Sequence, residues 1–344
     1  NLSPMARPPS ATPADLLALL ATGEPVPASR ILQELGISRP VLGRLVREAG
    51  NQVMRVGRAR ATAYVARAST DAGSTWPVWR MRSDATLEEL GALHLLRQGR
   101  FQFEPTGERP NLVRPLDGMS GHFPGLPWFL DDLRPQGFLG RSLAHRNGPE
   151  LGVPTDLNRW QLRDTLLAIT RTGGTAIGDL LLGGHAVERA LAELDTPPDS
   201  IQAPERHARY SEWADAALAG EEIGSSPGGE QPKFTSTVLS PEGRYAALVK
   251  FAIHDSGQAA ARWAELLACE QIALACLREA GLPAAEAEMV DAERHLCLEV
   301  RRFDRTPDHI GRRGFVSLLA LDAAFAGTGG HDWPLAGEQL AAEA

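Results

Sequence analysis

The first fifty residues contain three short stretches in which leucine, isoleucine and valine recur every three or four positions, the spacing of one helix face. They predict helices over residues 12–23, over about 28–35 and after Ser38. Thr12 and Ser38 can each cap a helix N-terminus, and Gly36 suits a helix end. Two short helices joined through a glycine-containing turn are typical of a helix-turn-helix.

Residues 53–65 alternate apolar and polar side chains around Gly57, which predicts a β-hairpin. Residues 1–68 are therefore interpreted as a winged helix-turn-helix, the hairpin being the wing. Its arginines would contact DNA, those of the third helix in a major groove and those of the wing near phosphates. They are Arg39, Arg44, Arg47, Arg55, Arg58 and Arg60. A helical protein-interaction module with a solvated arginine face remains the alternative.

A polar stretch over residues 69–75 predicts a linker, and a second unit over 76–150 follows it. Leucines spaced along residues 84–98 predict a helix in this unit. Residues 126–141 alternate apolar and charged side chains without a regular period. We expect them to form a buried loop, pinned by Arg134 and by the acid pair Asp131 and Asp132, rather than to take part in catalysis.

A third unit, residues 151–344, contains the glycine-rich segment 224–234, whose backbone could approach phosphates. It is neither a Walker loop nor a Rossmann fingerprint, and an ordinary surface turn would also explain it. Two β-type runs follow, 234–239 and 245–253, joined by a Pro-Gly turn. A helix is then predicted over about 258–280. Its apolar stripe is Trp263, Leu266, Leu267, Leu274 and Leu277.

Two charged residues interrupt these apolar patterns. Lys250 lies in the second strand and Glu270 in the middle of the helix stripe, where either charge is costly to bury alone. We predict that they pair. A glycine-rich loop, a strand lysine and a helix glutamate are also the order found in protein kinases, where the lysine holds phosphates of the nucleotide. Moreover, Lys233 and Lys250 are the chain's two lysines among 35 basic residues.

The charge is unevenly distributed. The net charge is −8, but residues 1–68 carry about +5 and the remainder about −13. We therefore expect that residues 1–68 alone bind a polyanion. No apolar run is long enough to span a bilayer, and no secretory signal is visible, which favours a cytoplasmic protein without a membrane partner. Cys269, Cys276 and Cys297 lack metal-ligand spacing and are predicted to be reduced core residues.

Several of these segments resemble one family, the HipA-like serine/threonine kinases. The stretches SSPGGEQPKF, ALVKF and LLACEQIALACLREAGLP resemble its phosphate loop, lysine strand and glutamate helix. Residues 299–305 resemble its hinge strand, which meets adenine, and SLLALDAAF resembles the segment that follows. DLRPQGFLGR resembles the branch that carries an N-terminal winged helix. The resemblance implies an α+β fold: a winged helix-turn-helix followed by a kinase-like N-lobe, with the C-terminal helical lobe truncated.

The resemblance also implies the cofactors and the site residues. ATP and Mg²⁺ are the expected cofactors. The expected nucleotide-binding residues are Ser226, Gly228, Gly229, Gln231, Lys233, Lys250, Glu270, Arg301 and Phe303. Ser225 and Ser226 would be autophosphorylation sites, and two turn-capping serines are the alternative. The chain contains no Asp-Arg-His-x-x-Asn type loop, so no catalytic residue and no metal ligand is assigned, and we expect the Mg²⁺ ligands beyond Ala344.

Partners follow from the same resemblance. We expect DNA at residues 1–68, a protein substrate such as a tRNA-charging enzyme, and an antitoxin. The alternative function is a winged-helix transcription regulator whose acidic body senses a ligand or nucleotide without catalysis.

Overall fold

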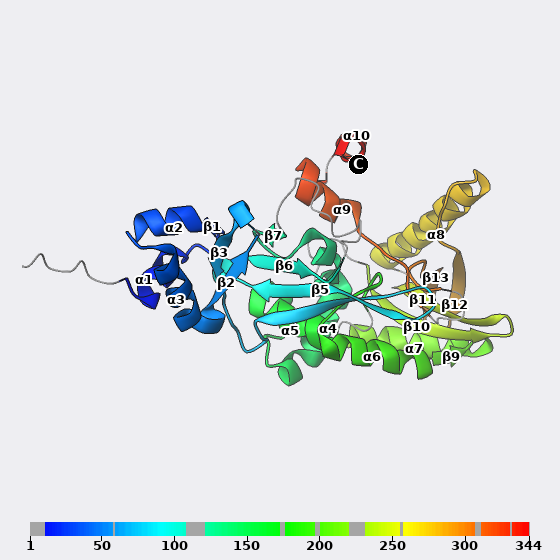
Figure 1. The fold of residues 1–344 in the computed structure, drawn as a ribbon. Helices are drawn as coiled ribbons and strands as arrows, with labels where there is room; N and C mark the ends of the chain where they lie inside the picture. The colour runs from blue at the N-terminus through cyan, green and yellow to red at the C-terminus, as the bar shows by residue number, and fades with distance from the viewer. Residues whose placement is uncertain are drawn as a thin grey trace, which may run out of the picture. The chain divides into compact units, whose positions relative to one another are not determined.

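The computed structural model of the chain describes residues 11–57, 59–107, 121–172, 176–196, 200–219, 231–254, 257–306, 311–330 and 332–343 (Figure 1). These residues form two compact units. The first contains residues 1–77, 90–131 and 321–344, and the second contains residues 78–89 and 132–320. The boundary passes through strands β4 and β5, so neither unit is continuous in sequence.

The N-terminal part of the first unit has the three helices that the sequence predicts, α1 (Pro13–Leu19), α2 (Ala28–Glu34) and α3 (Arg39–Ala49). The Thr12 hydroxyl accepts a hydrogen bond from the Asp15 amide at 3.3 Å, which confirms the predicted cap. Gly36 follows α2 with φ +61°, a left-handed conformation that glycine adopts without strain. Ser38 is the N-cap residue of α3, as predicted, although its side chain makes no capping hydrogen bond.

A three-stranded antiparallel sheet of order β1-β3-β2 completes this part. Strand β2 (Val53–Val56) pairs with β3 (Ala63–Ala66), which confirms the predicted hairpin, and β1 (Val26–Pro27) pairs with the other edge of β3. The buried core that unites helices and sheet consists of Leu16, Leu20, Val26, Ile31, Leu42, Leu45, Ala49, Val53 and Ala66.

The helix predicted over residues 84–98 is wrong, because the structure has a strand there, β5 (Leu87–Leu95). Most of the second half of β5 is buried, so this strand has hydrophobic residues on both faces. The resulting series of leucines has the same spacing as the apolar face of a helix. Gly91 permits close pairing with the next strand, since a Cβ there would lie 2.3 Å from the Glu104 carbonyl oxygen. The sheet has the order β7-β6-β5-β4-β8. Its other strands are β4 (Thr75–Met81), β6 (Phe101–Pro105), β7 (His122–Phe123) and β8 (Leu180–Leu182).

The predicted loop over residues 126–141 is only partly correct. A 3₁₀ helix covers Trp128–Leu133, and α4 (Gly137–Leu151) begins directly after a short extended stretch. Leu133 and Phe138 are buried, as expected for a packed segment. Two further helices follow in the second unit, α5 (Leu162–Thr172) and α6 (Gly184–Asp195).

The second unit is built around a five-stranded sheet of order β12-β13-β11-β10-β9. The predicted strands are present as β10 (Lys233–Ser240) and β11 (Gly243–Ile253) and pair antiparallel. The others are β9 (Ser200–Gln202), β12 (Ala287–Ala292) and β13 (His295–Arg301). Helix α7 (Arg206–Leu218) packs on one face through Tyr210, Ala214 and Ala217. Helix α8 (Gln258–Glu279), also predicted, packs on the opposite face through Ala264 and Leu267.

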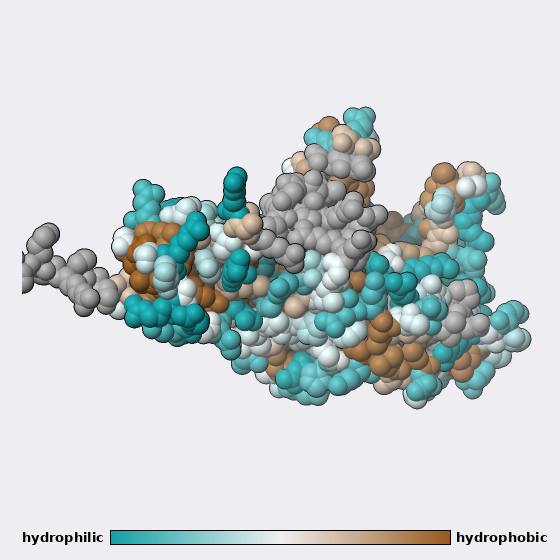
Figure 2. Space-filling model, viewed as in Figure 1, coloured by the Kyte–Doolittle hydropathy of each residue, from teal (hydrophilic) through white to brown (hydrophobic). Residues whose placement is uncertain are grey.

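The predicted apolar stripe of α8 is largely exposed, which corrects the expectation that it is buried. Leu267 is fully buried, whereas Trp263, Leu266 and Leu277 are exposed. Hydrophobic colouring is accordingly visible on this helix in Figure 2. Cys269 and Cys276 on the same helix are exposed as well, so two of the three predicted core cysteines lie at the surface. Three short helices, α9 (Leu318–Leu321), the π-helix Asp322–Ala326 and α10 (Trp333–Glu343), end the described chain.

Candidate functional site

The predicted pair of Lys250 and Glu270 is present. Lys250 lies on the α8 face of β11, and its Nζ donates hydrogen bonds to the Glu270 carboxylate oxygens at 2.5 and 2.7 Å. The two side chains are 21% and 34% exposed, so the ion pair lies at the border between the core and solvent. The sheet and α8 thus hold the ammonium group in one place.

Lys233 lies directly opposite Lys250 on the neighbouring strand, in register. Side chains of directly opposed residues project from the same face of an antiparallel sheet. The two lysines of the chain therefore lie side by side on the α8 face, where Lys250 is paired with Glu270. Gln231 precedes β10, and its Nε2 is buried without a hydrogen-bond partner among the described residues.

Four of the predicted nucleotide-loop residues cannot be placed. Ser225, Ser226, Gly228 and Gly229 lie outside the residues that the structure describes. Their expected roles, including autophosphorylation, stay predictions.

The predicted hinge residues follow directly from the sheet. Arg301 is the last residue of β13; its guanidinium lies 4.1 Å from the Tyr245 ring centroid and 3.2 Å from a Glu286 carboxylate oxygen. Phe303 is 53% exposed and lies against the Phe315 ring, with 5.6 Å between the ring centroids. An exposed aromatic ring at the end of a buried strand is available for stacking with a planar ligand.

A cavity of about 340 Å³ opens on the α8 face of the sheet beside the hinge residues. Thr235, Leu248 and Val300 line it from strands β10, β11 and β13. Leu248 is two residues before Lys250, so it projects from the same face. Further lining residues come from α5 and from residues 132–143, a segment to which the sequence assigned no role at this site.

Asp304, just beyond the hinge, is a buried anchor that the sequence did not reveal. Its carboxylate accepts hydrogen bonds from Arg302 at 2.7 Å, from Arg305 at 2.6 Å and from the Gly178 amide at 2.9 Å. Burial alone would raise its pKa, but hydrogen bonds and attraction from Arg302 and Arg305 outweigh it and lower the pKa of Asp304 to about 2. The carboxylate therefore ties the hinge to residues 176–178.

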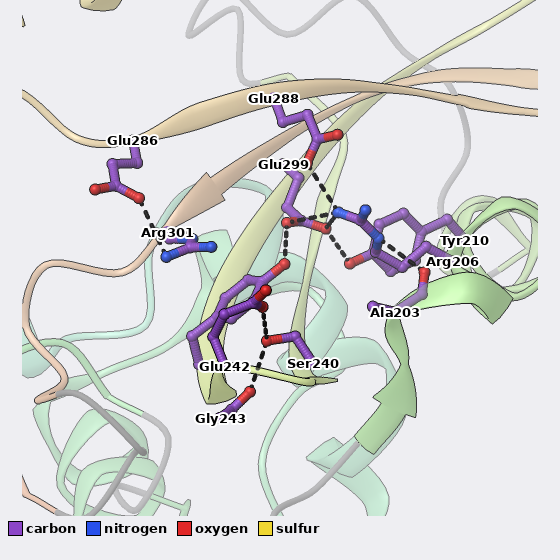
Figure 3. Close-up of polar contacts among 11 residues, drawn as sticks. Ala203, Arg206, Tyr210, Ser240, Glu242, Gly243, Glu286, Glu288, Glu299 and Arg301 are labelled. Carbon is purple, nitrogen blue, oxygen red and sulfur yellow. Dashed lines mark hydrogen bonds and ion pairs between the residues drawn. The ribbon is translucent and has the colours of Figure 1, made fainter.

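A second buried carboxylate, Glu299, organises the α7 face of the sheet (Figure 3). Glu299 is 2% exposed and accepts hydrogen bonds from Tyr210 at 2.6 Å, from Tyr245 at 2.8 Å and from Arg206 at 3.1 Å. Burial and the nearby carboxylate raise the pKa of both tyrosine hydroxyls, so these remain neutral donors. This network is on the face away from Lys250 and fixes β13 to α7.

The arginines predicted to contact DNA lie in the N-terminal part of the first unit. Arg39, Arg44 and Arg47 are exposed on α3, and Arg44 forms an ion pair with Glu48 at 3.8 Å. Arg55 on β2 and Arg60 are exposed too, and Arg55 donates a hydrogen bond to Thr62 at 3.3 Å. Arg58 lies outside the described residues.

Within the described part of the chain, no group of three or more histidines, cysteines or acids is arranged to hold a metal ion. None of the helices described there has the length and apolar character that a bilayer crossing requires.

Comparison with known proteins finds two family models and a similar protein that match this chain. The YjjJ-like toxin middle domain matches residues 72–191, and the HipA-like C-terminal domain matches residues 225–330. The chain is 37% identical over 327 residues to Toxin YjjJ of Escherichia coli strain K12, across 95% of this chain and 70% of that protein. The second domain match includes Lys233, Lys250, Glu270 and the hinge. The chain therefore belongs to the HipA-like toxin family.

Proposed function

We propose that the protein is an ATP-dependent serine/threonine protein kinase of the HipA type, and that residues 231–306 bind the nucleotide. The observation that carries this proposal is the ion pair between Lys250 and Glu270, next to the second lysine, Lys233. A kinase requires a fixed cation at the nucleotide phosphates and a carboxylate that positions it.

The chemistry of the face fits ATP in two further ways. The cavity beside Leu248 is mainly apolar, which suits a purine ring. Thr235 and Leu248, which line it, lie two residues from Lys233 and Lys250 on the same strands, so the lysines project from the same face and suit phosphates. Mg²⁺ bound together with ATP would neutralise part of the negative charge of the phosphates. The residues described here bind and orient the nucleotide.

A titration with a fluorescent ATP analogue tests this proposal. We expect saturable binding to the chain that ADP displaces. Failure of ATP to bind the correctly folded chain would remove the kinase proposal and favour the alternative, a winged-helix transcription regulator with a body that senses another ligand.

Phosphorylation of the glycine-rich segment should regulate nucleotide binding. We predict that replacing Ser225 and Ser226 together with glutamate weakens ATP binding by about tenfold or more, because added negative charge repels the nucleotide phosphates. The matched replacement with asparagine keeps polar side chains without charge and should retain most of the affinity. Equal loss of affinity in both double variants would contradict an electrostatic effect. Mass spectrometry of the ATP-treated protein would locate the phosphorylated serine.

We further propose that residues 11–68 are a winged helix-turn-helix that binds DNA. The order of three helices and the β2–β3 hairpin supports this, as do the exposed arginines of α3. Arg39 and Arg47 have no carboxylate partner among the described residues, so their charge is available to phosphates or bases.

We predict that replacing Arg39 and Arg47 with alanine weakens DNA binding and makes it less dependent on salt. Each lost phosphate contact reduces by about one the salt slope, that is, the slope of the logarithm of the binding constant against the logarithm of the salt concentration. The control is Arg30→Ala on α2, where Arg30 is paired with Glu34 at 2.6 Å. Electrophoretic mobility or anisotropy measured at several salt concentrations provides the test. An unchanged salt slope in the double variant would contradict the assignment of α3.

We propose two kinds of partner, as in the family that the sequence resembles. One is a protein substrate such as a tRNA-charging enzyme, and the other is an antitoxin. Phosphorylation of candidate substrates by the protein with ATP, and co-purification with the product of a neighbouring reading frame, would test each of them separately.

A further inference from the structure

We propose that residues 132–143, which end about ninety residues before strand β10, form the second wall of the base pocket and contribute to selecting the nucleotide. This inference rests on the proposed ATP binding. In the proposed complex, Leu139 and Leu143 contact the base from the side opposite Leu248, and the Gln136 amide forms hydrogen bonds with the polar edge of the base.

The shape and lining of the cavity carry the first step. Leu133, Leu139 and Leu143 line the same cavity of about 340 Å³ as Leu248 and Val300 of the sheet. Apolar side chains from two separate parts of the chain can enclose a flat ring on both faces. A purine is such a ring, and it would extend from the strand end toward the exposed Phe303.

Gln136 carries the second step. It is the residue before α4, it is exposed, and its side chain does not cap the helix. It lines the cavity, and no hydrogen-bond partner of its side chain is present among the described residues. An amide offers a donor and an acceptor side by side, and the adenine edge presents the matching acceptor and donor.

The third step is that this wall is held in place before any ligand arrives. The Asp132 carboxylate accepts a hydrogen bond from the Ser317 amide at 2.6 Å. Gly140 packs so closely that a Cβ there would lie 2.7 Å from the Pro135 carbonyl carbon. Leu133 and Phe138 are buried on either side of Gln136. A pre-positioned wall can discriminate between ligands because it does not reshape around the wrong one.

The experiment compares a nucleotide with its phosphate chain alone. Leu139→Trp adds bulk to the cavity, and Leu191→Trp on α6 is the control, since the two leucines are 38% and 41% exposed. We expect Leu139→Trp to weaken ATP binding at least tenfold and to leave the affinity for inorganic tripolyphosphate unchanged, whereas the control changes neither. Gln136→Leu, at an exposed position that does not endanger folding, should weaken ATP binding about fivefold, the size of one net hydrogen bond, and reduce the preference for ATP over GTP.

The outcomes separate this inference from the function on which it rests. If the unmodified protein binds ATP but Leu139→Trp and Gln136→Leu bind it equally well, the wall plays no part and the kinase proposal stands. If the variants lose ATP and tripolyphosphate alike, the segment acts on the fold and the inference is wrong. Failure of the unmodified protein to bind ATP would refute the proposed function itself.

Discussion

Replacing Lys250 with methionine is expected to weaken ATP binding at least tenfold while leaving the protein folded. A hydrogen bond to a charged group contributes about 1.5–3 kcal/mol, and Lys250 is the cation that the sheet and α8 hold in place. Methionine has a similar length, so the packing around β11 is preserved. Because Lys250 and Glu270 are both partly exposed, the loss of their ion pair should change the free energy of unfolding little.

The pairing itself is tested by Glu270→Gln alone and together with Lys250→Met. Glutamine keeps a hydrogen bond but removes the charge, so the single variant should bind ATP less well than the unmodified protein and better than Lys250→Met. If Glu270 acts by positioning Lys250, adding Glu270→Gln to Lys250→Met should cause no further loss. Independent, additive losses would show that Glu270 acts in another way. Arg209→Met is a matched control, because Arg209 forms a surface ion pair with Glu212 at 2.6 Å.

The part of the site that the sequence predicts is the part in which a local pattern is violated. Lys250 is conspicuous within an apolar strand, and Glu270 within an apolar helix stripe, so each charge indicates that a partner exists. The same reasoning found the N-terminal helices and hairpin, whose caps, turns and periodicities are local. Such signals need no knowledge of the tertiary structure.

The errors arise where burial depends on distant parts of the chain. Strand β5 carries leucines on both faces, which periodicity cannot distinguish from a helix. Helix α8 has an apolar stripe, but the sheet buries only Leu267 and neighbouring small residues, so periodicity overestimated its burial. The second wall of the cavity ends about ninety residues before β10, and nothing in residues 132–143 indicates what they face. The contact of Asp304 with the Gly178 amide also joins residues far apart in sequence.

The charge of Asp304 has the largest expected effect on stability. Asp304→Asn should lower the free energy of unfolding by about 3–5 kcal/mol, because it leaves buried Arg305 without its carboxylate partner. Asparagine can still accept the Gly178 hydrogen bond, so the loss reports mainly the charge. Hydrogen exchange of peptides that span residues 296–306 measures the effect locally, and Asp195→Asn at an exposed position is the control. Unchanged protection of these peptides would contradict a structural role for the Asp304 charge.

Acid should remove the same stabilisation from the unmodified protein. The pKa of Asp304 is about 2 in the folded state, below the value near 3.9 of an unfolded chain. A carboxyl with a lowered pKa stabilises the fold fully above the unfolded value and ceases to do so as the pH falls through the folded value. The stability difference between the unmodified protein and Asp304→Asn should therefore be constant above about pH 5 and shrink between about pH 4 and 2. The titrating part, about 2.5 kcal/mol, is smaller than the full cost of the substitution, because a protonated Asp304 keeps hydrogen-bond acceptors for Arg302 and Arg305.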